Sequence, residues 1–166
     1  FRVAPPNTPY TVPKFDVSTA KGAVQALQSP NLETRYLAWT SLRQMDRKAE
    51  KELAKLWKNG ESRQRARALW LLSKIEGRGQ KYIDQALKDK ESDIRITGLR
   101  AAQQLKTDVT PILKTLAKDA NPQVRREVAI ALRYNKSAEA PTIWADLASQ
   151  YDGKDKWYLE ALGIAS

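Results

Sequence analysis

The chain repeats one pattern at a fixed step of 30 residues. Residues 121–132 read NPQVRREVAIAL, and Arg125 has counterparts at Arg95, Arg65 and Arg35. We call a set of positions that lie 30 residues apart a column. Apolar or small residues occupy further columns: Leu132, Ala102, Leu72 and Leu42; Val128, Gly98, Ala68 and Ala38; and, upstream, Ile143, Leu113, Ile83, Leu53 and Ala23. A period of this length is typical of repeat proteins in which each unit stacks on the next.

The residues between these columns favour helices. Ala, Leu, Lys, Arg, Glu and Gln dominate the sequence, and runs of β-branched residues are scarce. We therefore expect an all-α superhelix of about five helical hairpins over residues 17–166. The expected hairpins span residues 17–45, 46–78, 79–106, 107–135 and 136–166.

Residues 1–16 have a different composition. Pro5, Pro6, Pro9 and Pro13 exclude a regular helix and favour an extended, semi-rigid arm. Its apolar residues lead us to expect that it lies against the first helices, where Ser18 or Asp16 caps the first one.

Two places in the repeat pattern carry specific expectations. The second helix of the second hairpin is predicted to run over residues 62–76, ending before Gly77-Arg78-Gly79. The step of 30 breaks in the last hairpin, where Asp155 stands at the arginine position. Because its apolar residues make a poor polar cap, we expect further protein after this hairpin.

Composition excludes several kinds of chemistry. The sequence has no Cys and no His, which removes thiol nucleophiles, disulfides, Cys/His metal sites and CxxCH haem attachment. No apolar run approaches the ~18 residues of a membrane-spanning helix, so membrane insertion is not expected. The chain begins at Phe1 without a Met or a signal-peptide pattern. We expect a segment of a longer protein, whose compartment this sequence leaves unknown.

The formal net charge is +10. Such a charge attracts polyanions. Lys and Arg are also good helix formers that keep a helical protein soluble, and no basic run or aromatic-interleaved motif accompanies the charge. Nucleic acid is therefore the alternative partner, behind protein.

The pattern N/D-x-x-V-R-x-x-A-x-x-A-L, in the second helix of each pair, resembles HEAT repeats. The resemblance covers residues 18–132 well and the last hairpin in part. It implies a right-handed α-solenoid, and it leaves function open because such repeats serve many unrelated scaffolds.

A narrower resemblance involves VPKFDVSTAKGAVQALQSPNLETRYLAWTSL and WADLASQYDGKDKWYLEALGIAS. Both stretches are similar to the HEAT region of large bacterial haem-binding proteins often described as membrane-bound dehydrogenases. In that family a dehydrogenase-like β-propeller precedes the HEAT segment and a c-type cytochrome module follows it. The resemblance implies an exported or periplasmic multidomain redox protein. No haem-ligating residue carries over, because this chain has no CxxCH.

The resemblance to HEAT repeats suggests a structural arginine ladder. Arg35, Arg65, Arg95 and Arg125 follow the turn inside each hairpin, and Asp89 and Asp119 precede two of them by six residues. Each arginine is expected to bind turn carboxylates or carbonyls of its own or the next repeat. The functional alternative is a row of anion sites.

Variable columns on the second helices are candidates for binding. If these helices line a concave face, an aromatic and arginine-rich patch of the kind enriched in interfaces is predicted there. Its members are Tyr36, Arg67, Trp70, Arg100, Arg126, Arg133 and Tyr134. The alternative is that Trp70 packs on its neighbours and the arginines are solvated.

The remaining tryptophans are expected to pack in the core, and the acidic pairs to be exposed to solvent. Trp39, Trp57, Trp144 and Trp157 fall on or beside core columns and are expected to pack there. The acid pairs Asp152/Asp155 and Glu50/Glu52 lie in turns or on charged faces, so we expect no catalytic residue, metal site or cofactor.

The leading hypothesis is a non-catalytic scaffold that positions neighbouring domains or docks another protein chain. The alternative is a basic nucleic-acid-binding protein similar to HEAT-like DNA glycosylases, in which Trp144, Asp146 and Arg133 would act on a lesion. A small-molecule enzyme on the same kind of scaffold, such as a lyase, is the third hypothesis.

Overall fold

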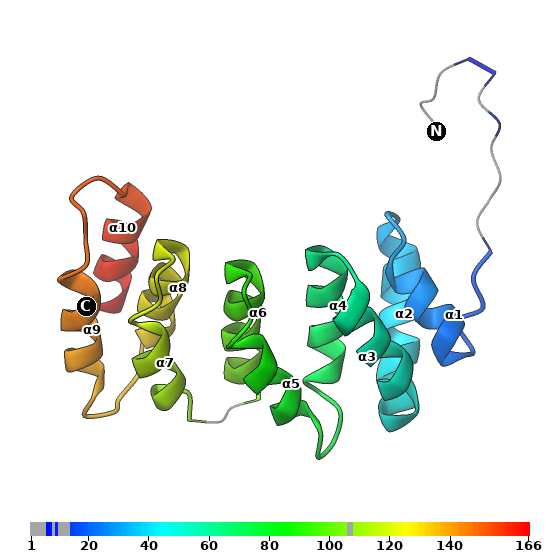
Figure 1. The fold of residues 1–166 in the computed structure, drawn as a ribbon, viewed down its shortest axis with the longest axis horizontal. Helices are drawn as coiled ribbons and strands as arrows, with labels where there is room; N and C mark the ends of the chain where they lie inside the picture. The colour runs from blue at the N-terminus through cyan, green and yellow to red at the C-terminus, as the bar shows by residue number, and fades with distance from the viewer. Residues whose placement is uncertain (1–5, 8, 10–13, 106–107) are drawn as a thin grey trace.

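The computed structural model describes residues 6, 7, 9, 14–105 and 108–166, and over these residues the fold is all-α without a strand. The α-helices, with one 3₁₀ helix, are α1 (Ala20–Leu27), α2 (Leu32–Met45), η1 (Asp46–Ala49), α3 (Glu50–Asn59), α4 (Ser62–Leu72), α5 (Gly79–Ala86), α6 (Ser92–Gln104), α7 (Thr110–Leu116), α8 (Pro122–Leu132), α9 (Ala140–Ala148) and α10 (Lys156–Ala165). Helix pairs follow one another along the long axis of the molecule (Figure 1).

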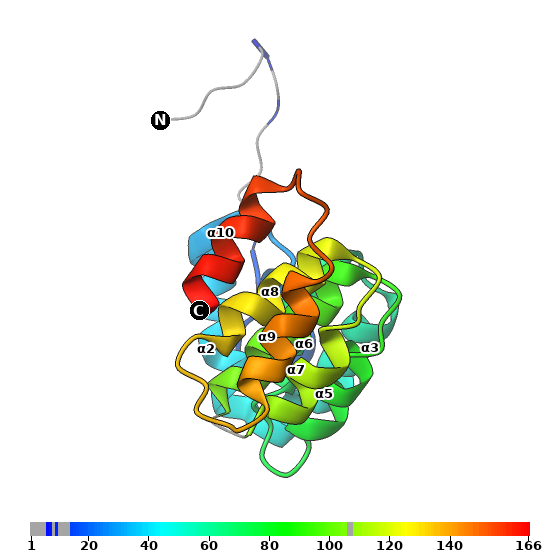
Figure 2. The same cartoon turned by 90° about the vertical axis from the view of Figure 1, so that its left-hand side faces the viewer.

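The helices form two layers. Each even-numbered helix packs on the next one, so that α2, α4, α6, α8 and α10 make one continuous layer. In the view along the stack, α3, α5, α7 and α9 lie on the other side (Figure 2). Each odd-numbered helix from α1 to α7 packs against the even-numbered helix that follows it.

The repeat columns form the core between the layers. Leu42, Leu72, Ala102 and Leu132 are buried at the same position of successive even-numbered helices. Two large buried clusters, one from Ala23 to Ile94 and one from Leu99 to Leu162, cover most of the stack. A small cluster around Ile83 and Ala101 adds the packing between α5 and α6.

Side chains at the helix starts satisfy free backbone N–H groups. Asn31 accepts a hydrogen bond from the Thr34 amide, and Thr19 accepts one from the Gly22 amide. The expected cap of the first helix at Ser18 or Asp16 is therefore wrong. Asp16 accepts hydrogen bonds from Ser18 instead, which orders the residues just before the helix.

Helix α4 ends at Leu72, so the predicted end at residue 76 is also wrong. Here the chain turns sharply towards α5, and a Cβ atom on Gly79 would lie 1.9 Å from the Ser73 carbonyl oxygen. Arg43 donates to the Lys74 carbonyl and Arg47 to that of Glu76, at 3.1 Å in both cases. Arg43 of the preceding hairpin and Arg47 of η1 therefore compensate for the lost helical hydrogen bonds.

The last hairpin keeps the step of 30 in its buried positions. Tyr158, Ala161 and Leu162 are buried in α10, 30 residues after the buried Val128, Ala131 and Leu132 of α8. Asp155, which breaks the sequence pattern, caps α10 by accepting hydrogen bonds from the Trp157 and Tyr158 amides. The break thus marks a later helix start, with the core register retained.

Most of the predicted arm, residues 1–16, lies outside the described residues, so its course stays a prediction.

We predict that Leu69→Ala lowers the free energy of unfolding by about 2–5 kcal/mol, because it leaves a cavity in the core. Leu69 is fully buried in α4. Urea unfolding monitored by circular dichroism measures the change. Leu37→Ala removes the same atoms from a solvent-exposed position of α2, so it should change stability by only about 0.5 kcal/mol. Equal losses in the two variants would contradict the assigned core.

Candidate interaction surface

Three of the four repeated arginines bind the turn that precedes their own helix, whereas Arg65 donates to the Trp57 carbonyl in the last turn of α3. Arg35 donates from Nη1 to the carbonyl oxygens of Ser29 and Pro30, at 3.0 and 2.6 Å. Arg95 makes the equivalent bonds to residues 89 and 90, and Arg125 to residues 119 and 120. These carbonyls follow the end of an odd-numbered helix, where no helical N–H can reach them.

The two middle arginines also reach forward to the next hairpin. Arg95 binds Asp119 with two parallel hydrogen bonds, Nε to Oδ2 at 2.7 Å and Nη2 to Oδ1 at 2.8 Å. Arg65 also pairs with Asp89 of the next hairpin, through Nη1 and Nη2, and its Nη1 additionally pairs with Glu91 at 3.1 Å. In both cases the carboxylate lies 24 residues after the arginine. We call these two contacts the carboxylate rungs.

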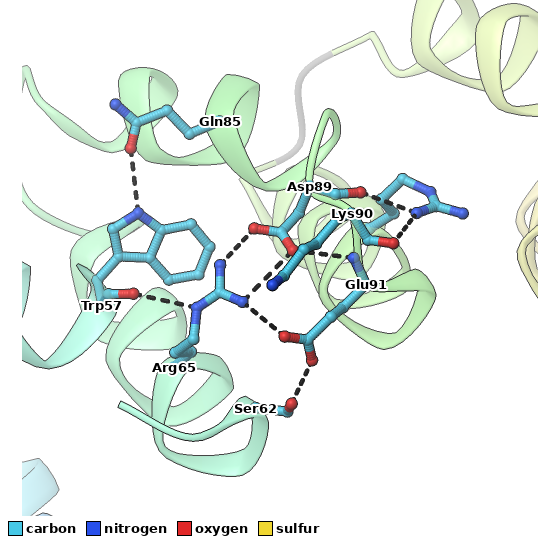
Figure 3. A network of polar contacts seen from close by, with 8 residues as sticks. Trp57, Ser62, Arg65, Gln85, Asp89, Lys90 and Glu91 are labelled. Atoms are coloured by element: carbon cyan, nitrogen blue, oxygen red, sulfur yellow. Dashed lines mark hydrogen bonds and ion pairs between the residues drawn. The ribbon is translucent and has the colours of Figure 1, made fainter. Parts of the chain in front are cut away.

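Figure 3 shows the first rung together with its neighbours. The Arg65 guanidinium lies 4.8 Å from the centre of the Trp57 ring, and its Nε donates to the Trp57 carbonyl at 3.1 Å. The indole N–H of Trp57 donates to Gln85, and Ser62 donates to Glu91. The guanidinium is therefore held on several sides, which fixes the position of α4 relative to the α5–α6 turn.

The electrostatics of the rungs stabilise the charged carboxylates. Burial alone would raise the pKa of Asp119, but hydrogen bonds from Arg95 and the Asn121 amide and the charge of Arg95 outweigh it and lower the pKa below 3.8. The pKa of Asp89 is lowered by the same balance, with Arg65 as the partner. The hydrogen bond to each aspartate raises the pKa of the Arg65 and Arg95 guanidinium groups.

The outer two arginines lack this forward partner. Positions 59 and 149, which lie 24 residues after Arg35 and Arg125, are Asn59 and Ser149. The Arg125 guanidinium lies 5.7 Å from the ring centre of Tyr158 instead. Among the described residues, its buried Nε has no hydrogen-bond partner. The column is thus continuous in sequence but unequal in its contacts.

The predicted interaction patch divides into separate parts. Arg100 forms two 2.7 Å hydrogen bonds with Glu127, and Arg126 lies 3.9 Å from Asp155. Arg133 lies over the ring of Tyr134, which follows the end of α8. The sequence pattern placed these arginines on one face, but acidic residues on the adjacent even-numbered helix neutralise two of them.

The other three members of the patch come together at the first hairpins. Tyr36, Arg67 and Trp70 line a pocket of 260 Å³ with Leu27, Leu32, Arg35 and Trp39. Trp70 is half-buried and also packs on the cluster around Ile83. It therefore contributes both to the core and to the pocket wall. We call this hollow the α2–α4 pocket.

Arg67 is one of two arginines that line the α2–α4 pocket, and its guanidinium lies near other positive charges. It donates to the Leu27 carbonyl at 3.1 Å. Burial lowers the pKa of its guanidinium, and the nearby positive charges of Arg35 and Arg63 lower it further. Within the described part of the chain, no ion pair joins these three arginines to a carboxylate.

A larger pocket of 620 Å³ was not foreseen from the sequence. It is lined by Leu132, Tyr134, Asn135, Lys136, Ser137, Ala140, Pro141, Trp144, Ala165 and Ser166. Four of its ten lining residues, 134–137, belong to the connection between α8 and α9, and three more come from α9. Of the three residues considered for a glycosylase-like site, Trp144 lines this pocket, whereas Arg133 and Asp146 are outside its wall.

The tryptophans expected to pack behave differently from one another. Trp57 is buried, and the indole N–H of the half-buried Trp144 donates to the Leu162 carbonyl at 3.0 Å. Trp39 is 37% exposed because no described helix precedes α2 in the even-numbered layer. Trp157 is 69% exposed, so its predicted packing is wrong. Tyr158 is buried in its place, because it lies 30 residues after the buried Val128 in the retained register.

The acidic pairs have structural partners. Asp152 accepts the backbone N–H groups of Lys154 and Asp155. Glu50 accepts the Tyr82 hydroxyl, and Glu52 pairs with Lys55. Burial and the hydrogen bond to Glu50 raise the pKa of Tyr82 to about 12. Over the described residues, Asp and Glu form no cluster of three or more that could hold a metal ion.

No family model matches the chain, and no curated protein matches it significantly in sequence. None of the described helices has the length and apolar character to span a membrane.

We predict that Arg95→Ala lowers the free energy of unfolding by about 3 kcal/mol, because it leaves the Asp119 carboxylate buried without its partner. Only 15% of the Arg95 side chain and 8% of the Asp119 side chain are exposed. The matched control is Arg100→Ala, whose pair with Glu127 is half exposed on the arginine side and should contribute about 0–1 kcal/mol. Chemical unfolding measures both, and an unchanged midpoint for Arg95→Ala would remove the ladder as a source of stability.

The lowered carboxylate pKa values predict a dependence on acid. A group with a lower pKa in the folded state stabilises the protein above its unfolded-state pKa, and this stabilisation is lost as the pH falls through the folded-state value. For Asp89 and Asp119 the loss therefore begins near pH 4 and continues below it. Melting temperatures from about pH 7 to about pH 3 should fall less steeply for Asp119→Asn than for the wild type. Parallel curves would contradict the assignment.

Proposed function

We propose that this chain is a right-handed, HEAT-like α-solenoid of five helical hairpins that acts as a non-catalytic scaffold. The observation that carries the proposal is the recurrence of one arginine–aspartate pairing between successive hairpins. The carboxylate rungs join Arg65 to Asp89 and Arg95 to Asp119 with the same sequence spacing. The buried columns repeat at the same step in all the even-numbered helices.

Such an architecture suits a spacer. When every unit contacts only its neighbours, each interface fixes the position of the next unit, and the stack holds its two ends at a set separation. Domains attached at the ends would be held apart in a defined orientation. The continuous even-numbered layer, whose helices each pack on the next, is the inner layer of this proposed solenoid.

The narrower resemblance supplies a context for the scaffold. In that context the chain belongs to an exported, periplasmic redox protein and positions a dehydrogenase-like propeller relative to a c-type cytochrome. The chemistry would then take place in those neighbouring domains. The scaffold's own contribution would be geometric, together with the docking of a protein partner on exposed side chains.

The absence of cysteine from the sequence allows a direct test. Spin labels on Lys21→Cys and Lys154→Cys occupy exposed positions in the first and last hairpins. Double electron–electron resonance should give one narrow distance distribution, because the stack behaves as a stiff spacer. The same pair in urea provides the broad reference. A broad distribution in native buffer would overturn the scaffold proposal.

A second candidate function, nucleic-acid binding, has one observation in its favour. Exposed lysines also repeat at the step of 30 on the odd-numbered side, at Lys21, Lys51 and Lys81 and at Lys58, Lys88 and Lys118. A regular row of cations can follow a phosphate backbone. Lysines near the ends of helices also interact favourably with the helix dipole, which explains the second set without a ligand.

Salt dependence distinguishes the two functions. If labelled duplex DNA binds to the lysine rows, the logarithm of the binding constant should fall with the logarithm of salt concentration by roughly 0.9 per phosphate contact. The scaffold predicts weak or absent binding at low salt. The triple variant Lys58→Gln, Lys88→Gln and Lys118→Gln identifies the surface, because it should reduce the slope only if these lysines bind phosphate.

A further inference from the structure

Exposed apolar side chains gather on the first even-numbered helix. Leu32, Tyr36 and Leu37 of α2 are 69, 63 and 57% exposed. The column of Tyr36 continues with Ala66, Ile96 and Arg126, and that of Leu37 with Arg67, Thr97, Glu127 and the exposed Trp157. Among the described residues, the first hairpin alone carries a large exposed apolar side chain in both columns. A contiguous exposed apolar surface commonly marks an interaction site.

The α2–α4 pocket opens within this surface and combines it with positive charge. Its aromatic wall is formed by Tyr36, Trp39 and Trp70, and its charged wall by Arg35 and Arg67. Arg63 adds a third positive charge that is close enough to lower the pKa of Arg67. A carboxylate from a partner would relieve this repulsion and accept hydrogen bonds from a guanidinium fork.

The positive charge is local. Along the same layer, Arg100 is paired with Glu127, and Arg126 lies close to Asp155. A nucleic-acid backbone carries charge at every nucleotide and is bound by a track of cations along a groove. A charged pocket flanked by neutralised arginines and lined by Leu27 and Leu32 fits a short segment with few charges and apolar side chains.

We propose that the α2–α4 pocket binds a protein segment that carries aspartate or glutamate beside an aromatic or aliphatic side chain. The proposal rests on the scaffold function and names the chemistry of its partner. The apolar side chain enters the 260 Å³ pocket between Tyr36 and Trp70. The neighbouring carboxylate binds Arg67, whose position is held by its hydrogen bond to the Leu27 carbonyl.

The charge of the chain's own arm disfavours it as the occupant. The arm, residues 1–16, is apolar in part and contains Arg2 and Lys14, and its one acidic residue, Asp16, already accepts hydrogen bonds from Ser18. Such a segment would bring positive charge to a site that holds Arg35 and Arg67 and lies close to Arg63. An acidic segment of another chain or another domain has the complementary charge.

The test uses the full chain and a fluorescein-labelled peptide in which Asp and Glu alternate with Phe and Leu. Fluorescence anisotropy should show saturable binding of the acidic peptide. A matched peptide with Asn and Gln in place of the acids should bind at least about tenfold more weakly. Absent binding of the acidic peptide, or equal binding of the two peptides, would overturn the proposal.

Matched variants locate the site. Arg67→Gln should weaken binding of the acidic peptide by about tenfold, and Tyr36→Ser, at an exposed position that leaves the core intact, by several-fold. Arg100→Gln makes the same chemical change on the same layer and should alter binding by no more than about twofold. Binding that is unchanged by both Arg67→Gln and Tyr36→Ser would place the peptide elsewhere and overturn the proposal.

Two competitors exclude the other occupants. Single-stranded DNA that displaces the peptide and binds more tightly would assign the aromatic wall to base stacking. A free peptide of residues 1–15 that displaces the acidic peptide and binds more tightly would assign the pocket to the arm. Either result overturns the proposal. The spin-label distances test the scaffold proposal separately. A narrow distance distribution without peptide binding would refute the proposed acidic partner and leave the scaffold proposal standing.

Discussion

The fold depends on apolar faces that no single hairpin can bury by itself. Ala68, Leu69 and Leu72 of α4 are inaccessible to solvent because helices on either side cover them. Removing apolar area from water stabilises the protein by about 25 cal/mol per Å², and in a stack each hairpin contributes this area to its neighbours. Stability is therefore a property of consecutive hairpins, which explains why the repeat columns recur so regularly.

The arginine column adds direction to this non-directional packing. Apolar surfaces alone allow helices to slide, whereas a guanidinium bound to two carboxylate oxygens accepts one orientation. Arg95 meets this requirement by holding its own turn and Asp119 of the next hairpin at once. Asp119 in turn accepts the Asn121 amide, so that one aspartate orders a turn and an interface.

The sequence predicted the helices and buried columns well because burial repeats with the helical period at every hairpin. It failed where a local choice between neighbours decides the outcome. Thr19, one residue beyond Ser18, caps α1, and Tyr158 is buried rather than Trp157 because Tyr158 occupies the core column of Val128. The division of the arginine patch depends on cross-helix pairs such as Arg100 with Glu127, whose geometry a linear pattern does not contain.

The unequal contacts of the arginine column have a mechanical consequence. Both carboxylate rungs lie in the middle of the chain and link the second hairpin to the third and the third to the fourth. Arg35 and Arg125, nearer the ends, hold only their own turns and, for Arg125, an aromatic ring. Under tension applied at its two ends, the molecule would unfold in steps. The terminal hairpins would unfold first, and the central three hairpins, which the carboxylate rungs link, would unfold last.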